Sequence, residues 1–204
     1  MMERGPPRTV LRQRPPPARR ANEPLGKESR MKWYDVSESA CHIARALSVV
    51  GDRWTLLIMR EIGIGSARRF EEIQAQTGMS SQLLAARLKR MEKHRVIERR
   101  AYQSNPDRYE YHATLEGKQL DAVLLALRGW GMRREGGSAT EPSIALADKR
   151  SGIPIDANWP FPDGQPFTFE QVDVTLSEAF AIERANRQTD FQSKRQGPKV
   201  RRKK

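Results

Sequence analysis

The stretch that decides the fold runs from Ser80 to His94 and reads S-S-Q-L-L-A-A-R-L-K-R-M-E-K-H. Wound as a helix at about 100° per residue, it brings Leu84, Leu88 and Met91 together on one side. The opposite side carries small, polar and basic residues: Gln82, Ala85, Ala86, Lys89, Arg90 and Lys93. We therefore predict an amphipathic helix that is anchored by its apolar stripe and presents a basic face.

A shorter helix is predicted directly before this one. The residues R-R-F-E-E-I-Q-A-Q-T-G start a helix at about Arg68 and end it at Gly78, and T-G-M-S then forms a turn. Two helices joined in this way form a helix-turn-helix, in which the second helix enters the major groove of DNA. Two more helices are predicted upstream, one ending at Gly51 and the next capped by Asp52.

The periodicity changes after His94. The segments V-I-E-R-R-A-Y and Y-E-Y-H-A alternate and flank the turn residues Q-S-N-P-D-R, which predicts a β-hairpin. A hairpin at this place makes the helix-turn-helix a winged one. Thr114 then caps a long helix whose apolar positions form one wide stripe: 120, 123, 124, 127 and 130.

This geometry predicts which residues would touch DNA. Gln82 is placed to read adenine, while the small side chains of Ala85 and Ala86 allow close approach and methyl contact to thymine. Arg100 and Arg108 flank the hairpin tip, which suits a wing on the backbone or minor groove. The full set of predicted DNA contacts is Ser81, Gln82, Ala85, Ala86, Lys89, Arg90, Lys93, Arg100, Ser104, Asn105 and Arg108. For Arg87 and Arg95 an internal salt bridge is an equally good interpretation.

The position of the charge supports this interpretation more than its total of +12. Residues 1–32 carry a net +6 and residues 183–204 a net +7, while the middle of the chain is nearly neutral at −1. Within that middle, residues 80–108 hold eight basic and three acidic side chains. A local basic patch on a near-neutral body points to a polyanionic partner, here double-stranded DNA.

The chain divides into four predicted parts. Residues 1–34 form a disordered basic tail rich in Pro and Arg, in which Met31 is an alternative start, and residues 35–135 form the winged helix-turn-helix domain. Residues 136–182, with several prolines and aromatics, form a small irregular or β-rich extension, with two short strands around a turn at Ser151–Gly152. Residues 183–204 form a second disordered basic tail. The fold class is therefore mostly α, of the α+β type.

Several blocks of the sequence resemble the HxlR-type regulators, which are bacterial winged helix-turn-helix transcription factors related in fold to the MarR group. The blocks include C-H-I-A-R-A-L-S-V-V-G-D-R-W-T-L-L-I-M-R-E-I, R-R-F-E-E-I, S-S-Q-L-L-A-A-R-L-K-R-M-E and R-Y-E-Y-H-A-T-L-E-G. The similarity covers about residues 38–134, and the spacing holds through every block. The long tails and the extension beyond about residue 136 depart from the many shorter members.

The resemblance implies a homodimer on a roughly palindromic operator, with a dimer contact built from the first helix and the long last helix. The residues that would form this contact are Ile43, Leu47, Leu120, Val123, Leu124, Leu127 and Trp130. Independently, the stripe on the last helix is wide for a helix that packs only on its own domain, although that alternative stays open.

Cys41 lies where this family has its characteristic N-terminal cysteine, which in several members senses oxidants or electrophiles. A helix start favours the reactive thiolate, and Arg45 lies one turn further on. The alternative is a small buried apolar residue, the usual fate of a free cysteine. Because this is the single cysteine of the chain, any disulfide would join two chains or a small thiol.

The sequence offers no site for an enzyme. The three histidines do not form a metal-ligand spacing with Cys41, and no catalytic triad or phosphate-binding loop is present, so we expect no metal and no cofactor. No apolar run spans a membrane and no export signal fits, which predicts a cytoplasmic protein. The effector stays unknown.

Two other functions remain as alternatives. One is a general nucleic-acid or nucleoid-associated binder, driven by the two basic tails. The other is a protein-interaction module, in which the winged fold binds a protein partner instead of DNA.

Overall fold

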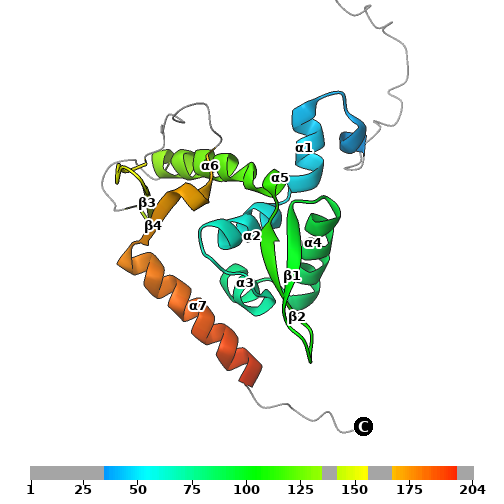
Figure 1. Ribbon diagram of the computed structural model, residues 1–204, viewed down its shortest axis with the longest axis vertical. Coiled ribbons are helices and arrows are strands. Elements are labelled where there is room, and N and C mark those ends of the chain that lie inside the picture. Colours follow the sequence, from blue (N-terminus) through cyan, green and yellow to red (C-terminus); the bar gives the residue numbers. More distant parts are fainter. Residues whose placement is uncertain (1–34, 135–141, 156–166, 197–204) are drawn as a thin grey trace, which may run out of the picture.

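The computed structural model describes residues 35–134, 142–155 and 167–196, so the predicted tail 1–34 lies outside the described residues (Figure 1). A short 3₁₀ turn, η1, comes first at Asp35–Glu38. The helices that follow are α1 His42–Val50, α2 Arg53–Gly63, α3 Phe70–Thr77, α4 Ser81–Lys93, α5 Leu115–Lys118, α6 Leu120–Arg134 and α7 Glu178–Gln196. The strands are β1 Ile97–Gln103, β2 Arg108–Ala113, β3 Ile144–Asp148 and β4 Val172–Leu176.

The predicted helix signals act as expected in the helix-turn-helix. The Asp52 carboxylate accepts hydrogen bonds from the backbone N–H groups of Trp54 at 2.9 Å and Thr55 at 3.1 Å, which caps α2. Gly78 ends α3 in the left-handed region at a φ of 68°, where glycine has no steric penalty. The Ser80 hydroxyl accepts from Leu83 N–H at 3.3 Å and so caps α4.

The core lies where the apolar stripes of these helices meet. Leu84 and Leu88 of α4 pack with Ile58 and Ile62 of α2, and Ile73 of α3 joins them; none of the five is more than 1 % exposed. This burial holds one side of α4 against the domain and leaves its other side in solvent. The amphipathic helix predicted from residues 80–94 is thus confirmed.

The β-hairpin is also confirmed, with β1 and β2 antiparallel from Ile97 opposite Ala113 to Gln103 opposite Arg108. A bulge lies between Ala101 and Gln103. Tyr111 N–H donates to the Arg68 carbonyl at 2.8 Å, which ties the hairpin to the residues before α3. Figure 1 shows the hairpin tip projecting from the body of the molecule as a wing.

The long helix predicted from Thr114 is two helices, α5 and α6, separated at Gln119. The Thr114 hydroxyl accepts from Gly117 N–H at 3.0 Å and donates to the Arg95 carbonyl, so the first turn is held against the start of β1. Gly117 lies directly against the carbonyl of Val96. After this anchored turn the chain starts a new helix at Leu120.

The extension contains the predicted turn, with Gly152 at a φ of 69°, but the strand pairing differs from the prediction. β3 pairs antiparallel with β4, from Ile144 opposite Leu176 to Asp148 opposite Val172, while the residues after the turn add only an isolated bridge at Pro154. The buried residues Leu146, Ile155, Phe167, Phe169 and Val172 belong to the same apolar cluster as the helix-turn-helix core. The extension is therefore packed onto the domain beside α6.

The prediction of a disordered tail over 183–204 is wrong for residues 183–196, which belong to α7; residues 197–204 lie outside the described residues. Polar contacts attach α7 to the domain. Arg184 lies 2.8 Å from the fully buried Glu61 carboxylate, which also binds Arg60 at 2.6 Å. Arg187 donates to the Gln76 carbonyl at 3.1 Å. Since Glu61 lies in α2 and Gln76 in α3, these contacts attach α7 to both helices.

Candidate nucleic-acid interface

The exposed side of α4 is the centre of the candidate interface. Six of the predicted contacts lie on it and are exposed: Ser81, Gln82, Ala85, Ala86, Lys89 and Lys93. Within the described residues, the ion pairs of α4 join Arg87 to Asp52 and Glu92 to Arg99. Lys89 and Lys93 are therefore not neutralised by a carboxylate of the described chain, and both ammonium groups face solvent.

Arg90 does not belong to this exposed face. Its guanidinium donates to the carbonyl of Ser48 in α1, and the side chain is half-buried. On the helical wheel Arg90 lies at the border of the basic side, close to Arg87, and a long side chain at a border can turn either way. The prediction of Arg90 as a DNA contact is thus corrected: the residue holds α1 against α4. Arg87 makes the internal salt bridge to Asp52, at 3.2 Å.

The turn before α4 is held by one side chain that the sequence reasoning missed. Gln74 Nε2 donates to the Met79 carbonyl at 3.2 Å and to the Ser81 hydroxyl at 2.9 Å. These bonds join the end of α3 to the start of α4 across the turn. Gln74 therefore positions the residues that would lie nearest the bases. No motif in the sequence singled it out, because its partners are set by the turn geometry.

The wing presents a second basic surface. Ser104, Asn105 and Arg108 are exposed at its tip, as predicted. Arg100 is exposed as well, but it binds Glu98 of the same strand at 2.5 Å, which partly neutralises it. Of the two arginines that flank the tip, Arg108 makes no ion pair with a carboxylate of the described residues.

Two further arginines lie over aromatic rings of the wing, and the sequence reasoning did not assign them. The Arg99 guanidinium lies 4.7 Å from the centre of the Tyr109 ring, and Arg69 lies 4.6 Å from that of Tyr102. Such stacking restrains a long side chain. Both charges are also paired, Arg99 with Glu92 at 3.4 Å and Arg69 with Glu110 at 3.5 Å, so these arginines order the wing more than they add free positive charge.

His112 lies at the base of this wing, 3.5 Å from Glu110. Burial lowers the pKa of the His112 imidazole, and the nearby charges of Arg68 and Arg100 lower it further, against the opposite effect of Glu110. The imidazole is thus neutral near pH 7 and does not add to the basic surface.

The residues predicted for the dimer contact divide into two groups. Five are exposed on α1 and α6, among them Ile43 at 71 % and Trp130 at 55 % exposure; the other three are Leu47, Val123 and Leu127. Leu124 is buried in the core of its own chain, and Leu120 is half-buried against that core. The assignment of Leu124 is corrected, because its face of α6 packs inward.

Cys41 is exposed and lies just before α1, at the N-cap position. Its side chain caps no helix N–H, while its backbone N–H donates to the Ser39 hydroxyl at 3.2 Å. The Arg45 guanidinium donates to the Ser39 carbonyl at 3.2 Å. The thiol is therefore accessible, and Ile43 of the exposed apolar group lies two residues further on.

The described residues contain no group of three His, Cys, Asp or Glu side chains that is suited to hold a metal ion. None of the helices in these parts of the chain has the length and apolarity that a membrane crossing requires.

The chain is similar to proteins of known family. Residues 49–137 match the model of the HxlR-like helix-turn-helix family. The uncharacterized HTH-type transcriptional regulator Rv3095 of Mycobacterium tuberculosis is 39 % identical over 89 residues, which cover 44 % of this chain and 56 % of that protein. The HTH-type transcriptional regulator YodB of Bacillus subtilis is 36 % identical over 86 residues, which cover 42 % of this chain and 76 % of YodB. The chain thus spans little more than half the length of the mycobacterial relative.

One solved structure extends the likeness beyond the helix-turn-helix. The crystal structure of PA1607, described as a candidate transcription factor, superposes with a TM-score of 0.52 at 31 % sequence identity. The superposition covers 69 % of this chain and 98 % of PA1607. That share is larger than residues 49–137 alone, so the likeness includes residues outside the family match.

Proposed function

This chain belongs to the HxlR-like helix-turn-helix family, and on that premise we propose that it is a DNA-binding transcriptional regulator that acts as a homodimer on a roughly palindromic operator. The regulator acts on the chromosome in the cytoplasm. It carries out no catalysis, in keeping with relatives that are named as regulators.

The observation that carries this proposal is the exposed side of α4. It combines a group that can read a base edge, Gln82, with two small residues and the unpaired cations Lys89 and Lys93. Phosphate contacts by the lysines supply most of the affinity and make it depend strongly on salt. Ser81, Gln82, Ala85 and Ala86 supply the sequence preference. The wing adds contacts through Arg100, Arg108 and the tip residues Ser104 and Asn105.

A homodimer is supported by the exposed apolar residues of α1 and α6. Monomeric proteins seldom leave such a group of large apolar side chains in water, and a two-fold contact buries the group of both copies at once. A two-fold dimer also matches a palindromic operator, because each half-site then meets one α4.

Redox or electrophile sensing through Cys41 is the finer part of the proposal, and the exposed position of the thiol supports it. In the first step a hydroperoxide transfers an oxygen atom to the thiolate, which becomes a sulfenic acid, and the peroxide leaves as an alcohol or water. Attack by a second thiolate then forms a disulfide with release of hydroxide. Since the chain has one cysteine, the second thiolate belongs to the other subunit or to a small thiol.

The test is a binding titration of the reduced protein against DNA from the flanks of its own gene and against random DNA. It is run at about 0.15 M salt, where exposed charges are screened beyond roughly 8 Å. A clear preference for the flanking DNA is expected. Equal binding to both DNAs would favour the tail-driven nucleic-acid binder, and no binding to either would favour a protein-interaction module.

The tails are tested by removing residues 1–34 and 197–204 while α7 is kept intact. A specific regulator loses part of its non-specific affinity but keeps its preference for the flanking DNA. A binder driven by the tails loses nearly all binding.

The thiol is tested by repeating the titration after mild oxidation, with Cys41→Ser as the matched variant. Loss of binding in the oxidised wild type alone is expected. Unchanged binding on oxidation would contradict a sensing role for Cys41.

A further inference from the structure

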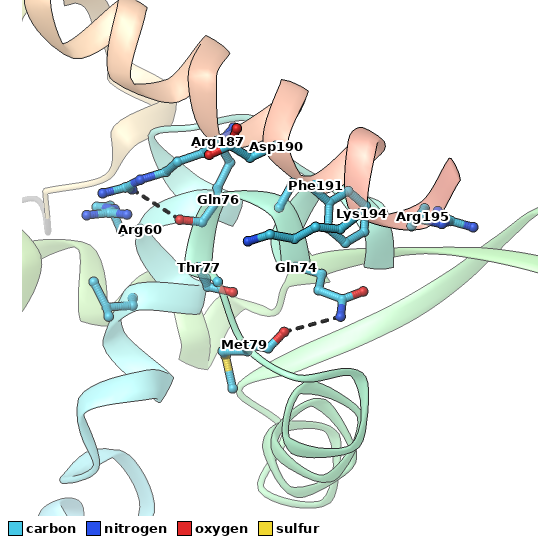
Figure 2. A pocket seen from close by; sticks show the side chains of 13 residues that line it. Arg60, Gln74, Gln76, Thr77, Met79, Arg187, Asp190, Phe191, Lys194 and Arg195 are labelled. Carbon is cyan, nitrogen blue, oxygen red and sulfur yellow. Dashed lines mark hydrogen bonds between the residues drawn. The ribbon is translucent and has the colours of Figure 1, made fainter. Parts of the chain in front are cut away.

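A pocket of about 560 Å³ lies between α7 and the helix-turn-helix (Figure 2). One wall is formed by α7, with Phe191 and Lys194, and the other by the end of α3 and the turn, with Gln76, Thr77 and Met79. Leu57 of α2 also contributes to the lining. The volume is in the range of pockets that bind small molecules. The lining combines apolar side chains with a larger number of polar and charged ones.

Gln76 supplies a buried polar group that the protein itself does not use fully. Its side chain is 9 % exposed, and Nε2 donates to the Arg184 carbonyl at 3.1 Å. Its Oε1 atom accepts no hydrogen bond from any described residue. Buried acceptors are nearly always satisfied in folded proteins, so the unsatisfied Oε1 atom is available to a donor from outside the chain. Because the atom itself has almost no accessible surface, the Gln76 side chain must turn toward the pocket to meet such a donor.

Lys194 supplies an unpaired cation in the same pocket. In the described residues the other cations of α7 each bind a carboxylate: Arg184 binds Glu61, Arg187 binds Glu183 and Arg195 binds Glu71. Lys194 has no such partner, although Asp190 lies one turn earlier on α7. Figure 2 shows the Lys194 side chain extending from α7 into the pocket.

We propose that this pocket binds a small organic anion that has an apolar or aromatic body and one hydrogen-bond donor. The anionic group pairs with Lys194, the body packs against Phe191, Leu57 and Met79, and the donor reaches Gln76 Oε1. A simple inorganic anion would meet only the first requirement. A nucleic-acid phosphate would also use Lys194, but it would bury neither the apolar lining nor Gln76.

The pocket is placed to influence the recognition helix. Its wall includes Gln74 and Met79, and Gln74 bridges the turn to Ser81 at the start of α4. A bound anion lowers the positive potential next to this start, so DNA affinity decreases when the pocket is filled. This regulatory step rests on the proposed function; the binding of the anion does not.

Binding is tested without DNA on the full chain labelled with ¹⁵N, by titration with 4-hydroxyphenylacetate to about 10 mM at constant ionic strength. We expect saturable shifts of the amide signals of residues 74–79 and 190–194, localised to the pocket. Phenylacetate, which lacks the hydroxyl, is expected to bind several-fold more weakly. Acetate and the cation 4-hydroxyphenylethylamine are expected to cause no saturable shift. Equal effects of acetate, or no saturable shift with 4-hydroxyphenylacetate, would overturn the proposal.

Three variants locate the binding site. Lys194→Gln is expected to weaken the binding of 4-hydroxyphenylacetate about three- to fivefold, because Lys194 is exposed and an exposed ion pair contributes modestly to affinity. Asp190→Asn removes the competing carboxylate and is expected to strengthen binding. Arg150→Gln removes one positive charge in the exposed turn of the extension and serves as the matched control, with unchanged affinity expected. If the Arg150 and Lys194 variants lose similar affinity for 4-hydroxyphenylacetate, the anion is attracted by the overall positive charge and not by this pocket. That result would overturn the proposed site.

The regulatory step is tested by DNA titration with and without saturating 4-hydroxyphenylacetate. A decrease in DNA affinity of about threefold or more is expected in the wild type, and no change in Lys194→Gln. If the probe binds but the protein does not bind DNA, the proposed function fails and the pocket stands. If the protein binds DNA but does not bind the probe, the pocket proposal is wrong and the proposed function stands. If no probe binds and Lys194→Gln by itself weakens DNA, Lys194 is a DNA contact and the small-molecule site is wrong.

Discussion

Gly117 is the residue whose size matters most for the packing of the wing against α5. A Cβ atom at this position would lie 1.9 Å from the Val96 carbonyl oxygen and 2.9 Å from its carbon, and both are backbone atoms that cannot rotate away. We expect Gly117→Ala to lower the free energy of unfolding by about 2 kcal/mol or more, as overpacking against fixed atoms does. The measurement is chemical denaturation of the two proteins.

Gly131 in α6 provides the control for this prediction. An added Cβ there has no neighbour within 4 Å, so Gly131→Ala is expected to be neutral or to stabilise by up to about 1 kcal/mol through helix propensity. Similar destabilisation by both substitutions would show that the contact with Val96 is not the cause.

Asp121 makes the stability of the fold depend on pH. Burial raises the pKa of its carboxyl to about 6, although the hydrogen bond from Phe169 N–H at 3.0 Å acts in the opposite direction. A folded-state pKa above the unfolded value means that the native state binds the proton more tightly. The contribution to stability is therefore complete below about pH 4 and is lost as the pH rises through 6, at a cost of up to about 3 kcal/mol.

Asp121→Asn is expected to remove most of this pH dependence, because the amide oxygen still accepts from Phe169 and has no charge to bury. The measurement is the denaturation midpoint from pH 4 to pH 7.5, with the exposed Asp173→Asn as the control. If the wild-type and Asp121→Asn curves stay parallel over this range, Asp121 is not the group responsible.

At the scale of elements, α4 shows how far a helical wheel can predict a site. The wheel placed Gln82, Lys89 and Lys93 on the exposed side, where they lie. It also placed Arg90 there, but the partner of this side chain is the Ser48 carbonyl of α1. The wheel gives the direction of a Cβ atom, whereas the end of an arginine is determined by neighbours from other parts of the chain.

This difference predicts two different effects on DNA binding. If Lys93 contacts a phosphate, Lys93→Gln decreases the slope of log affinity against log salt by about 0.9 and weakens operator and random DNA alike. Arg90→Gln removes the same charge from the same helix but is expected to leave the slope unchanged. Both are measured by titrating DNA at several salt concentrations, and equal slopes for the two variants would contradict the assignment of Lys93.

The helix α7 could not be predicted by the same reasoning. Its segment is rich in charged and polar residues, a composition that usually indicates a disordered tail. The contacts that hold it are polar and distant in sequence: Arg184 with the buried Glu61, and Arg187 with the Gln76 carbonyl. One sequence does not show which carboxylate an arginine meets. For the same reason the pairing of β3 with β4 was missed while the turn at Gly152 was found.

At the scale of the whole molecule, the family pattern predicted the domain well because local signals agree there. Caps at Asp52 and Ser80, the glycine end at Gly78 and the apolar stripe of α4 all point to one arrangement. The extension packs on this domain with buried residues of the same core, while α7 is attached by the polar contacts of Arg184 and Arg187. Five large apolar side chains stay exposed on α1 and α6 in the described part of the chain: Ile43, Leu47, Val123, Leu127 and Trp130.

If a second copy covers this group, a single charge within it should separate the copies. We expect Leu127→Glu to raise the dimer dissociation constant by roughly 30-fold or more, because an unpaired carboxylate is costly to bury in an apolar contact. The monomer should also lose affinity for the operator, since each copy then meets only one half-site. Analytical ultracentrifugation measures the first effect and DNA titration the second.

Ile182→Glu is the matched control, because Ile182 is exposed on α7, away from α1 in Figure 1. If Leu127→Glu remains a dimer while Ile182→Glu becomes a monomer, the contact lies on α7 and the pairing of α1 with α6 is wrong.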